Sequence, residues 1–299
     1  MVSWPPLGTR VTVRYRRPAG SVPPLTDAVG QLLEIEPLVR VQTKTGAVVQ
    51  FAPTDVVAVR ALSDAPVRNS QIRALEHAAA FAWPGVEQQW LGGWLLRAGH
   101  GVTSRANSAV PLDISAVPAS IPAIVDWYTR RGLTPRLAIA DRLLRLPGAG
   151  EQANRVLVRA VCTADPDPQV RLSARPDDAW LRFYRREIPV EILTAVVDGE
   201  LAFGMHTDLA VARASVTDAP DGTRWVGLSA VRVTDQQPGA GRAVCEALLA
   251  WGADRGATRG YVRVLDADHA AAGLAQSLGF AVHHRARYFT ATPALAEAR

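Results

Sequence analysis

The chain has 299 residues, of which 48% are hydrophobic, and a formal net charge of +5 that arginine supplies almost alone. A chain of this size and composition buries a substantial core and is long enough for two or three domains, which excludes a disordered or fibrous protein. The basic residues are spread along the sequence, so the charge fits an anionic ligand as well as it fits nucleic acid. Nucleic acid is therefore not an expected partner.

The two cysteines, Cys162 and Cys245, lie far apart, and no second cysteine or histidine stands at ligand spacing from either. Neither a zinc site nor a disulfide framework is predicted, and reduced thiols are typical of the cytosol. Residues 1–10 contain no apolar leader, and no apolar stretch has the length of a membrane span. We expect a soluble, cytoplasmic protein without a bound metal or a membrane partner.

The first patterned segment is a series of short runs rich in β-branched residues, separated by proline and glycine. Runs this short and numerous favour a small β-barrel over a parallel sheet, and the segment resembles the Src-homology or Tudor type. A polar stretch ends this first domain, residues 1–64. Arg14, Arg16 and Arg17 mark either a solvated strand end or a face for nucleic acid or an acidic partner, and the barrel's hypothetical role is to bind a protein. The expected strands are residues 10–15, 28–35, 38–42, 48–51 and 55–60.

The pattern predicts a second domain at residues 65–160. It contains helical periodicity, glycine-rich turns and a strand between two turn-rich stretches, where we place the next boundary. The expected elements are a helix at 69–81, two strands at 90–97 and 105–108 joined by a glycine-rich turn, a helix at 121–131 that stops at Gly132, and a strand at 155–162.

The third domain, residues 161–299, alternates helices and strands in a mixed α/β pattern. Asp198 and Gly199 form a hairpin signal between two apolar stretches. The expected elements are a helix at 177–186, apolar stretches at 192–197, 201–205 and 209–216, then a strand from 226, a helix from 241, a strand from 261, a helix from 268 and a strand at 281–290.

The most informative stretch runs from Val226 to Arg242, where a strand leads through a glycine-rich loop directly into a helix. The apolar alternation changes phase at Ala230 and Val231, as a β-bulge would produce. The first N–H groups of a helix have no intrahelical partner and carry partial positive charge, so glycines there let a phosphate approach the backbone. The loop is therefore a predicted anion cradle.

Two common phosphate-binding motifs fit this loop poorly. A Walker-type loop needs a lysine beside its last glycine, and the only lysine of the chain is Lys44, which excludes that motif. The dinucleotide fingerprint finds its first two glycines in Gly239 and Gly241, but its third small position is Val244. The fingerprint remains a minor alternative.

A third motif, Gln/Arg-x-x-Gly-x-Gly/Ala, is satisfied by residues 236–241. Residues 268–280 follow the pattern Asn-x-x-Ala-x-x-Leu-Tyr-x-x-x-Gly-Phe except at Asp268 and Ala275. With this spacing the C-terminal part of the chain resembles the catalytic core of the GNAT superfamily of N-acetyltransferases. The resemblance implies a mixed-sheet α/β GNAT fold, with the second domain as a degenerate first GNAT half.

The resemblance also implies an enzyme that transfers acetyl from acetyl-CoA to a primary amine of a small molecule or peptide. The whole chain looks like actinobacterial acetyltransferases, some of which carry an N-acetylglutamate synthase label, so an amino acid such as glutamate is the leading acceptor. The rival interpretation is a non-catalytic acyl-CoA sensor or scaffold whose barrel binds a partner.

The acetyl-CoA site that the resemblance implies lies on the strand, the loop and the two following helices. The pantetheine arm is expected along the strand, and the pyrophosphate at the cradle. The residues are Val231, Arg232, Val233, Gln236, Gln237, Gly239, Ala240, Gly241, Arg242, Ala243, Asp268 and Ala271.

The family's usual acid, a tyrosine that protonates the leaving thiolate, is replaced by Ala275. Ser277 lies nearby, but we expect Tyr288 or one of the two histidines, His283 and His284, to take its place as the catalytic acid. Adjacent residues of a strand point to opposite faces, so we expect at most one histidine to enter the cleft.

Overall fold

The computed structural model describes residues 4–5, 7, 9–43, 47–62, 67–165, 167–234 and 238–296. It divides the chain into two compact units, Met1–Val67 and Arg68–Arg299. The expected end of the first domain, residue 64, lies outside the described residues. Each unit has its own core and is described separately.

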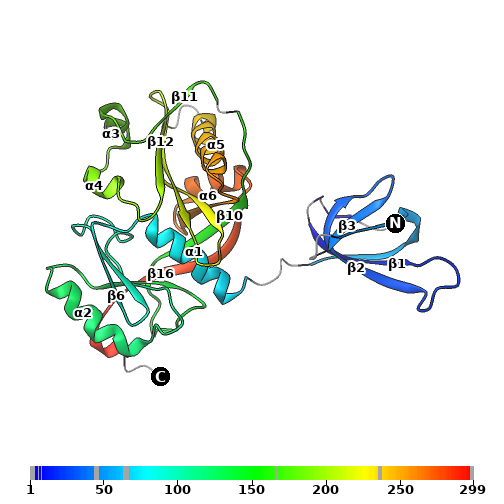
Figure 1. Ribbon diagram of the computed structural model, residues 1–299, viewed down its shortest axis with the longest axis horizontal. Coiled ribbons are helices and arrows are strands. Elements are labelled where there is room, and N and C mark those ends of the chain that lie inside the picture. The colour runs from blue at the N-terminus through cyan, green and yellow to red at the C-terminus, as the bar shows by residue number, and fades with distance from the viewer. Residues whose placement is uncertain are drawn as a thin grey trace. The chain divides into compact units, whose positions relative to one another are not determined.

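The first unit is an antiparallel sheet of five strands in the order β4-β3-β2-β1-β5 (Figure 1). Along the strands buried residues alternate with exposed ones, and Val11, Val13 and Val41 lie in the core. The predicted small all-β domain is thereby confirmed. Arg14 lies on the exposed side, where its Nε donates to Oδ1 of Asp27 at 2.8 Å. The strands are β1 Arg10–Arg16, β2 Leu25–Glu34, β3 Val39–Thr43, β4 Val48–Phe51 and β5 Val56–Ala61, with a short 3-10 helix at Pro53–Asp55.

The second unit is built on an eight-stranded sheet in the order β11-β12-β13-β14-β15-β10-β16-β9. Neighbouring strands are antiparallel except β14 and β15, which are parallel. This mixed α/β arrangement is the predicted fold class. The strands are β9 Arg136–Ala140, β10 Glu151–Ala160, β11 Val170–Ser173, β12 Glu200–His206, β13 Ala210–Asp218, β14 Arg224–Val233, β15 Arg259–Leu265 and β16 Ala281–Thr290.

Among the described residues of this unit there are also a three-stranded sheet and six α-helices. Figure 1 shows the three-stranded sheet beside α2. The sheet consists of β6 Glu87–Leu91, β7 Trp94–Ala98 and β8 Val110–Pro111. The helices are α1 Asn69–Phe81, α2 Ile121–Thr129, α3 Asp178–Tyr184, α4 Val190–Leu193, α5 Pro238–Asp254 and α6 His269–Ser277, with 3-10 turns at Pro118–Ser120 and Pro293–Ala296.

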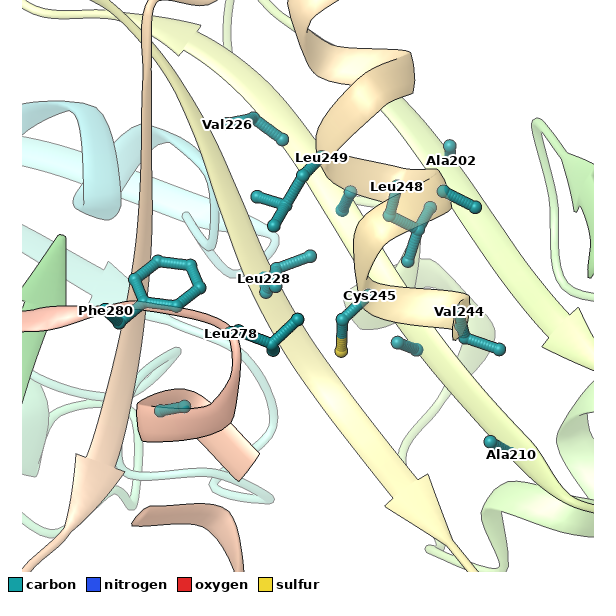
Figure 2. Close-up of a cluster of buried hydrophobic side chains, with 14 of the residues drawn as sticks. Ala202, Ala210, Val226, Leu228, Val244, Cys245, Leu248, Leu249, Leu278 and Phe280 are labelled. Carbon is teal, nitrogen blue, oxygen red and sulfur yellow. The ribbon is translucent and has the colours of Figure 1, made fainter. Parts of the chain in front are cut away.

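Helix α5 covers one face of the large sheet. Its apolar side points toward the strands, and Figure 2 shows the resulting core. Two glycines let helix and strand approach closely: a Cβ at Gly241 would lie 2.6 Å from Val233, and one at Gly252 would lie 2.5 Å from Val226. The labelled core residues are Ala202, Ala210, Val226, Leu228, Val244, Cys245, Leu248, Leu249, Leu278 and Phe280.

Helix α1 covers part of the opposite face. Its apolar residues, such as Leu75, pack with Trp225 and Tyr261 of the sheet. The hydroxyl of Thr217 in β13 donates to the carbonyl of Ala78 at 2.9 Å, which fixes the helix to the strand. The two faces of the sheet therefore carry different layers, α5 and α6 on one and α1 on the other.

The predicted pair of strands at residues 90–97 and 105–108 is wrong. Residues 90–97 are broken by Gly92 and Gly93, which both have positive φ and form the turn between β6 and β7. Residues 105–108 form no strand, because Oδ1 of Asn107 accepts hydrogen bonds from the N–H groups of Gly99 and Gly101 and so holds a loop together.

The predicted hairpin at Asp198 and Gly199 is also wrong, because the stretch before it contains α4 instead of a strand. Asp198 has a φ of 47° and ends the connection into β12. The hairpin between β12 and β13 turns later, where Asp208 has a φ of 54°.

The division at residue 160 stays a prediction. Strand β10, which ends there, lies between β15 and β16 and pairs with both. Within the part of the chain that the structure describes, no helix has the length and apolar character needed to cross a membrane.

Candidate functional site

Strands β14 and β15 are paired along only part of their length. Their ladder covers residues 225–228 and 259–262, and beyond it β14 turns away. The turn coincides with the predicted bulge: Ser229 lies opposite Arg213 and Arg232 opposite Val211, so the bulged strand has one extra residue. The backbone at Ala230 adopts a left-handed conformation, with a φ of 51°. The two strands therefore open at this point, and backbone groups that would join them are left for another partner.

The predicted anion cradle lies at the start of α5. Gly239 is exposed, and a Cβ built there would meet no atom within 4 Å, so the backbone is open to a ligand. Gly241 is buried and serves the packing on Val233 instead. Gln236 and Gln237 lie outside the described residues.

Arg242 joins this helix end to α6, because its Nη1 donates to the carbonyl of Ser277 at 2.9 Å. Its side chain is also exposed, and its Nη2 lies 3.9 Å from Glu246 one helical turn later. Ala240 is buried and Ala243 is partly buried against the core. Arg242 therefore links the first turn of α5 to α6 and places a positive charge on the exposed side of this turn.

The three predicted residues of β14 beyond the bulge have different environments. Val231 and Val233 are partly buried and pack against the core under α5. Arg232 is exposed, and its Nη1 donates to the carbonyl of Tyr184 at 3.3 Å. Beyond the bulge, β14 therefore has two apolar side chains under α5 and one exposed arginine.

The predicted residues of α6 have structural contacts. Oδ1 of Asp268 caps the helix by accepting from the N–H of Ala271 at 2.9 Å. The hydroxyl of Ser277 donates to the carbonyl of Leu274 at 2.8 Å. Ala275, where the family pattern has tyrosine, is 3% exposed within the core. A substitute acid must therefore come from another element.

A partly enclosed polar cavity lies on the opposite face, between α1 and the sheet. Its volume is about 20 Å³, enough for about one water. Its lining includes Gly227 and Ser229 of β14, so the cavity reaches the residue before the bulge. Polar groups from distant elements meet here: Glu76, Arg105, Ser215, Ser229, Tyr261 and Tyr288.

Arg213 holds the wall of this cavity together. Its Nε donates to the carbonyl of Leu193 at 2.7 Å, and Nη2 donates to the carbonyls of Ala82 and Ala195, both at 2.9 Å. Nη1 donates to the hydroxyl of Ser229 at 3.2 Å. Burial lowers the pKa of Arg213 to about 9, and the guanidinium still remains charged at neutral pH.

Glu76 is a fully buried carboxylate that contacts two basic side chains. Its Oε1 accepts from Nη2 of Arg263 at 2.5 Å and from Nε2 of His284 at 2.8 Å. Burial raises the pKa of Glu76, but the charge of Arg263 and the hydrogen bond from His284 outweigh it and lower that pKa to about 2. The carboxylate is therefore ionised at neutral pH.

The two histidines and Glu76 form a row of side-chain contacts. Nδ1 of His283 lies 2.8 Å from Nδ1 of His284. An ionised carboxylate only accepts, so Nε2 of His284 carries a proton, and the contact between the two Nδ1 atoms needs a proton on one of them. Burial, then the neighbouring His284, lowers the pKa of His283 to about 4, which keeps it neutral.

The expectation that these histidines point to opposite faces is wrong. The ladder between β10 and β16 shifts at this point, with His284 opposite Val156 and Val282 opposite Leu157. His283 is the extra residue, and the irregularity turns both rings to one side, 5.1 Å apart at their centres. His284 and His283 contact the cavity only through Glu76, because neither lines it.

Two tyrosines line the cavity directly. Tyr288 is buried in β16 and packs with apolar residues of β8 and β9. Tyr261 lies across Gly227, where a Cβ would come within 2.3 Å of the tyrosine oxygen. Burial raises the pKa of Tyr261, so its hydroxyl stays protonated at neutral pH. Gly227 is thus needed to seat the Tyr261 ring beside β14.

Of the predicted catalytic residues, the structure places Tyr288 in the cavity and the histidines behind Glu76. Sequence reasoning missed Glu76, Arg213 and Tyr261. The sequence pattern could have indicated the first two, because each is a charged residue at an apolar position. Glu76 lies on the apolar side of α1, and Arg213 lies within a buried strand. No group of three or more histidine, cysteine or acidic side chains that could hold a metal ion occurs among the described residues.

Two family models match the chain. The model described as "Probable histone acetyltransferase Rv0428c C-terminal" matches residues 69–289. The model "Rv0428c N-terminal Sm-like domain" matches residues 5–60. Together they cover both structural units.

Relatives with curated names match most of the chain. "Probable histone acetyltransferase Rv0428c" of Mycobacterium tuberculosis is 64% identical over 296 residues, which is 97% of each chain. "Uncharacterized N-acetyltransferase YobR" of Bacillus subtilis is 25% identical over 235 residues, covering 70% of this chain and 94% of its own length.

Solved structures with similar folds share little sequence. A GCN5-related N-acetyltransferase from Kribbella flavida has a TM-score of 0.49 at 13% identity and covers 79% of this chain and 100% of its own. A tandem GNAT protein from the clavulanic acid biosynthesis pathway has a TM-score of 0.41 at 12% identity, with coverage of 77% and 91%.

Proposed function

Because this chain belongs to the probable histone acetyltransferase Rv0428c family, which is of the GNAT type, we propose that it transfers acetyl from acetyl-CoA directly to a primary amine. The observation that carries the proposal is the opening of β14 from β15 at the Ala230 bulge, between the glycine cradle and the polar cavity.

The cradle and β14 are suited to acetyl-CoA. The open backbone at Gly239 and the partial positive charge of the α5 N-terminus suit a pyrophosphate, and Arg242 adds a positive charge on the exposed side. The free edge of β14 beyond Ala230 suits the amide groups of a pantetheine arm running toward the bulge. Gln236, Gln237, Ala240, Ala243, Asp268 and Ala271 are proposed to shape this site.

Acetyl transfer makes three demands on the residues around the thioester. The amine nitrogen forms a bond to the carbonyl carbon, the carbonyl oxygen gains negative charge, and the carbon–sulfur bond breaks to release a thiolate that takes up a proton. Backbone N–H groups freed by the bulge suit the charged oxygen, since fixed donors stabilise developing charge. Loss of a proton from the nitrogen completes the amide.

We assign protonation of the departing thiolate to Tyr288. The two histidines, His283 and His284, are proposed as a second contribution to this step. Tyr288 lines the cavity and carries a hydroxyl, whereas Ala275 brings no acid at all. Contacts run from His283 through His284 to Glu76, which lines the same cavity as Tyr288, and through Glu76 the histidines are proposed to influence the proton transfer.

Two acceptor classes have separate support. The resemblance of the chain to proteins labelled N-acetylglutamate synthase favours a free amino acid such as glutamate. The name of the Mycobacterium tuberculosis relative favours a lysine in a basic protein tail. Replacement of the family tyrosine by buried Ala275 supports a third possibility, an acyl-CoA sensor without turnover.

The test uses the full chain, acetyl-CoA and a panel of amines that includes amino acids and a lysine-bearing histone-tail peptide. Thiol release is measured together with the mass of the amine product, and acetyl-CoA binding is measured by calorimetry. Amine-dependent release of thiol with an acetylated product supports the proposal. Tight binding without turnover on any amine assigns the sensor, and absence of binding contradicts both.

A further inference from the structure

The polar cavity carries more positive charge than its lining residues neutralise. Four arginines line it, and Glu76 is the one carboxylate among the described residues that do so. Of the four, only Arg263 forms an ion pair within the described part of the chain, and its partner is Glu76 itself. Arg97, Arg105 and Arg213 are left without an anion. Because charges in a partly enclosed site are poorly screened, this imbalance favours a bound anion over a neutral molecule.

Two of these positive charges, those of Arg105 and Arg213, lie close together. Their guanidinium carbons are 5.7 and 4.4 Å from the ring centre of Trp83, which also lines the cavity. Burial lowers the pKa of both arginines, and the charge of Arg105 lowers the pKa of Arg213 further. Two like charges over one ring repel each other, so a negative charge in the cavity would offset an unfavourable interaction.

Arg105 differs from its neighbours in its hydrogen bonds. Arg213 donates to three carbonyls and to Ser229, so its donors hold the walls. Nε of Arg97 donates to the carbonyl of Ser108 at 3.3 Å, and Nη2 donates to the hydroxyl of the same residue at 2.9 Å. Within the described residues the guanidinium of Arg105 makes no hydrogen bond and no ion pair. Its N–H groups therefore remain available for a ligand.

A second donor in the cavity also lacks a partner. The Ser215 side chain is 1% exposed and lines the cavity, and its hydroxyl makes no hydrogen bond within the described chain. Ser215 lies opposite Gly227 in the ladder of β13 and β14, and Gly227 lines the same cavity. A buried polar atom that stays unpaired is costly, so we expect the cavity to hold a partner for this hydroxyl.

The size of the cavity limits what that partner can be. A volume of about 20 Å³ has room for about one water, which excludes phosphate, a carboxylate or an amino acid, because each has several non-hydrogen atoms. Chloride is a single atom only slightly larger than a water molecule, and it accepts hydrogen bonds without donating any. It therefore matches a site whose two unpaired groups, Arg105 and Ser215, can both donate.

We propose that the cavity binds a monatomic anion of the size of chloride, held by the guanidinium of Arg105 and the hydroxyl of Ser215. The ion offsets part of the charge of Arg105 and Arg213 and gives the Ser215 hydroxyl a partner. Ser215 belongs to β13 and Arg105 to the loop between β7 and β8, so the ion links the large sheet to the three-stranded sheet. The site goes beyond the proposed function, because it requires neither acetyl-CoA nor an amine.

The first test measures the stability of the full chain as sodium chloride replaces sodium acetate at constant ionic strength. Acetate is too large for the cavity, whereas chloride binds the folded state and stabilises it. At about ten times its Kd, a ligand of the folded state alone lowers the unfolding equilibrium constant about elevenfold. We therefore expect the thermal midpoint to rise by about 3 °C or more in chloride. A midpoint that does not depend on the anion overturns the proposal.

The second test uses variants to separate the site from general effects of salt. Ser215→Ala and Arg105→Met each remove a donor and should raise the Kd for chloride about tenfold or more, because a hydrogen bond to an ion is lost. The Kd is obtained from the rise of the midpoint with chloride concentration. Arg130→Met, at an exposed position outside the cavity lining, is the matched control and should respond as the parent chain does. Equal responses in all four proteins would assign the effect to bulk salt and overturn the site.

The third test locates the ion. A crystal of the full chain grown in sodium bromide should give an anomalous scattering peak in the cavity, within hydrogen-bond distance of Arg105 and Ser215. A water without anomalous signal at this position, or bromide at surface positions only, contradicts the proposal. If Arg105→Met does not fold, Ser215→Ala and the bromide peak of the parent chain decide. None of these measurements uses turnover, so they remain decisive even if the proposed function fails.

Discussion

Nε2 of His284 lies 2.8 Å from Oε1 of Glu76, a residue 208 positions earlier in the chain. The contact joins α1 to β16, and Arg263 of β15 meets the same oxygen. One buried carboxylate thus connects the beginning of the second unit to its last strand, and it does so at the wall of the cavity.

Glu76→Gln should lower the free energy of unfolding by about 3 kcal/mol or more, because it leaves Arg263 charged and buried without its anion. The control is Glu87→Gln, which breaks an exposed pair with Arg131 and should cost less than about 1 kcal/mol. Urea denaturation of both variants measures the difference. Equal losses would mean that the buried contact stabilises no more than a surface pair.

Stability should fall as the pH drops below about 6.5. His283 has a lowered pKa, about 4, so between the ordinary histidine pKa of 6.5 and pH 4 the unfolded chain binds the extra proton and is favoured. The loss is about 2 kcal/mol, since a pKa unit corresponds to about 1.4 kcal/mol and partial exposure weakens it. Glu76 adds a further loss below its ordinary pKa of 4.5, down to about 2.

The variant His283→Gln should reduce the slope of the curve between pH 6.5 and 4, and the slope that remains should belong to His77, whose pKa burial also lowers. His269→Gln, at an exposed position, is the matched control. Denaturation midpoints measured across this pH range test the assignment. A curve that keeps its slope in His283→Gln would show that another group titrates.

Two glycines of the cradle should respond in opposite ways. Gly239→Glu places a side chain and a negative charge in open space at the helix N-terminus, so acetyl-CoA should bind at least about tenfold more weakly while stability changes little. Gly241→Ala brings a Cβ within 2.6 Å of Val233 and should destabilise the fold. Calorimetry and thermal denaturation separate the two effects; unchanged affinity in Gly239→Glu would remove the cradle from the acetyl-CoA site.

The first unit should be dispensable for acetyl-CoA binding. The two units have separate cores, so residues 68–299 should fold alone and keep the affinity of the full chain within about twofold, well inside the tenfold effect of 1.4 kcal/mol. Calorimetry on the shortened protein measures this. An unfolded fragment, or one that loses acetyl-CoA, would make the all-β unit part of the catalytic core.

The parts of the molecule that could be predicted are those set by local pattern. Helix α1 and strand β16 have the expected bounds, and the phase change at Ala230 does mark a bulge. The cavity could not be predicted, because Glu76 and Tyr288 reach it from elements that are distant in sequence. The second bulge, at His283, depends on the register of β10 and leaves no trace in the sequence of β16 itself.

The acid that replaces the family tyrosine can be identified with three variants. Tyr288→Phe removes only a hydroxyl and should lower kcat by about tenfold or more without changing acetyl-CoA affinity, since general-acid catalysis contributes at least about a hundredfold and the two histidines retain part of it. His284→Gln alone should lower kcat less, and the double variant should lower it further than Tyr288→Phe.

Tyr261→Phe is the matched control, because Tyr261 lines the same cavity with a hydroxyl seated over Gly227. A larger loss in Tyr261→Phe than in Tyr288→Phe would move the acid to β15. Ala275→Tyr should not restore a lost acid, because position 275 is 3% exposed within the core and a ring there would overpack it, costing about 1–3 kcal/mol. Recovery of turnover in Tyr288→Phe/Ala275→Tyr would show instead that this part of α6 opens toward the thioester.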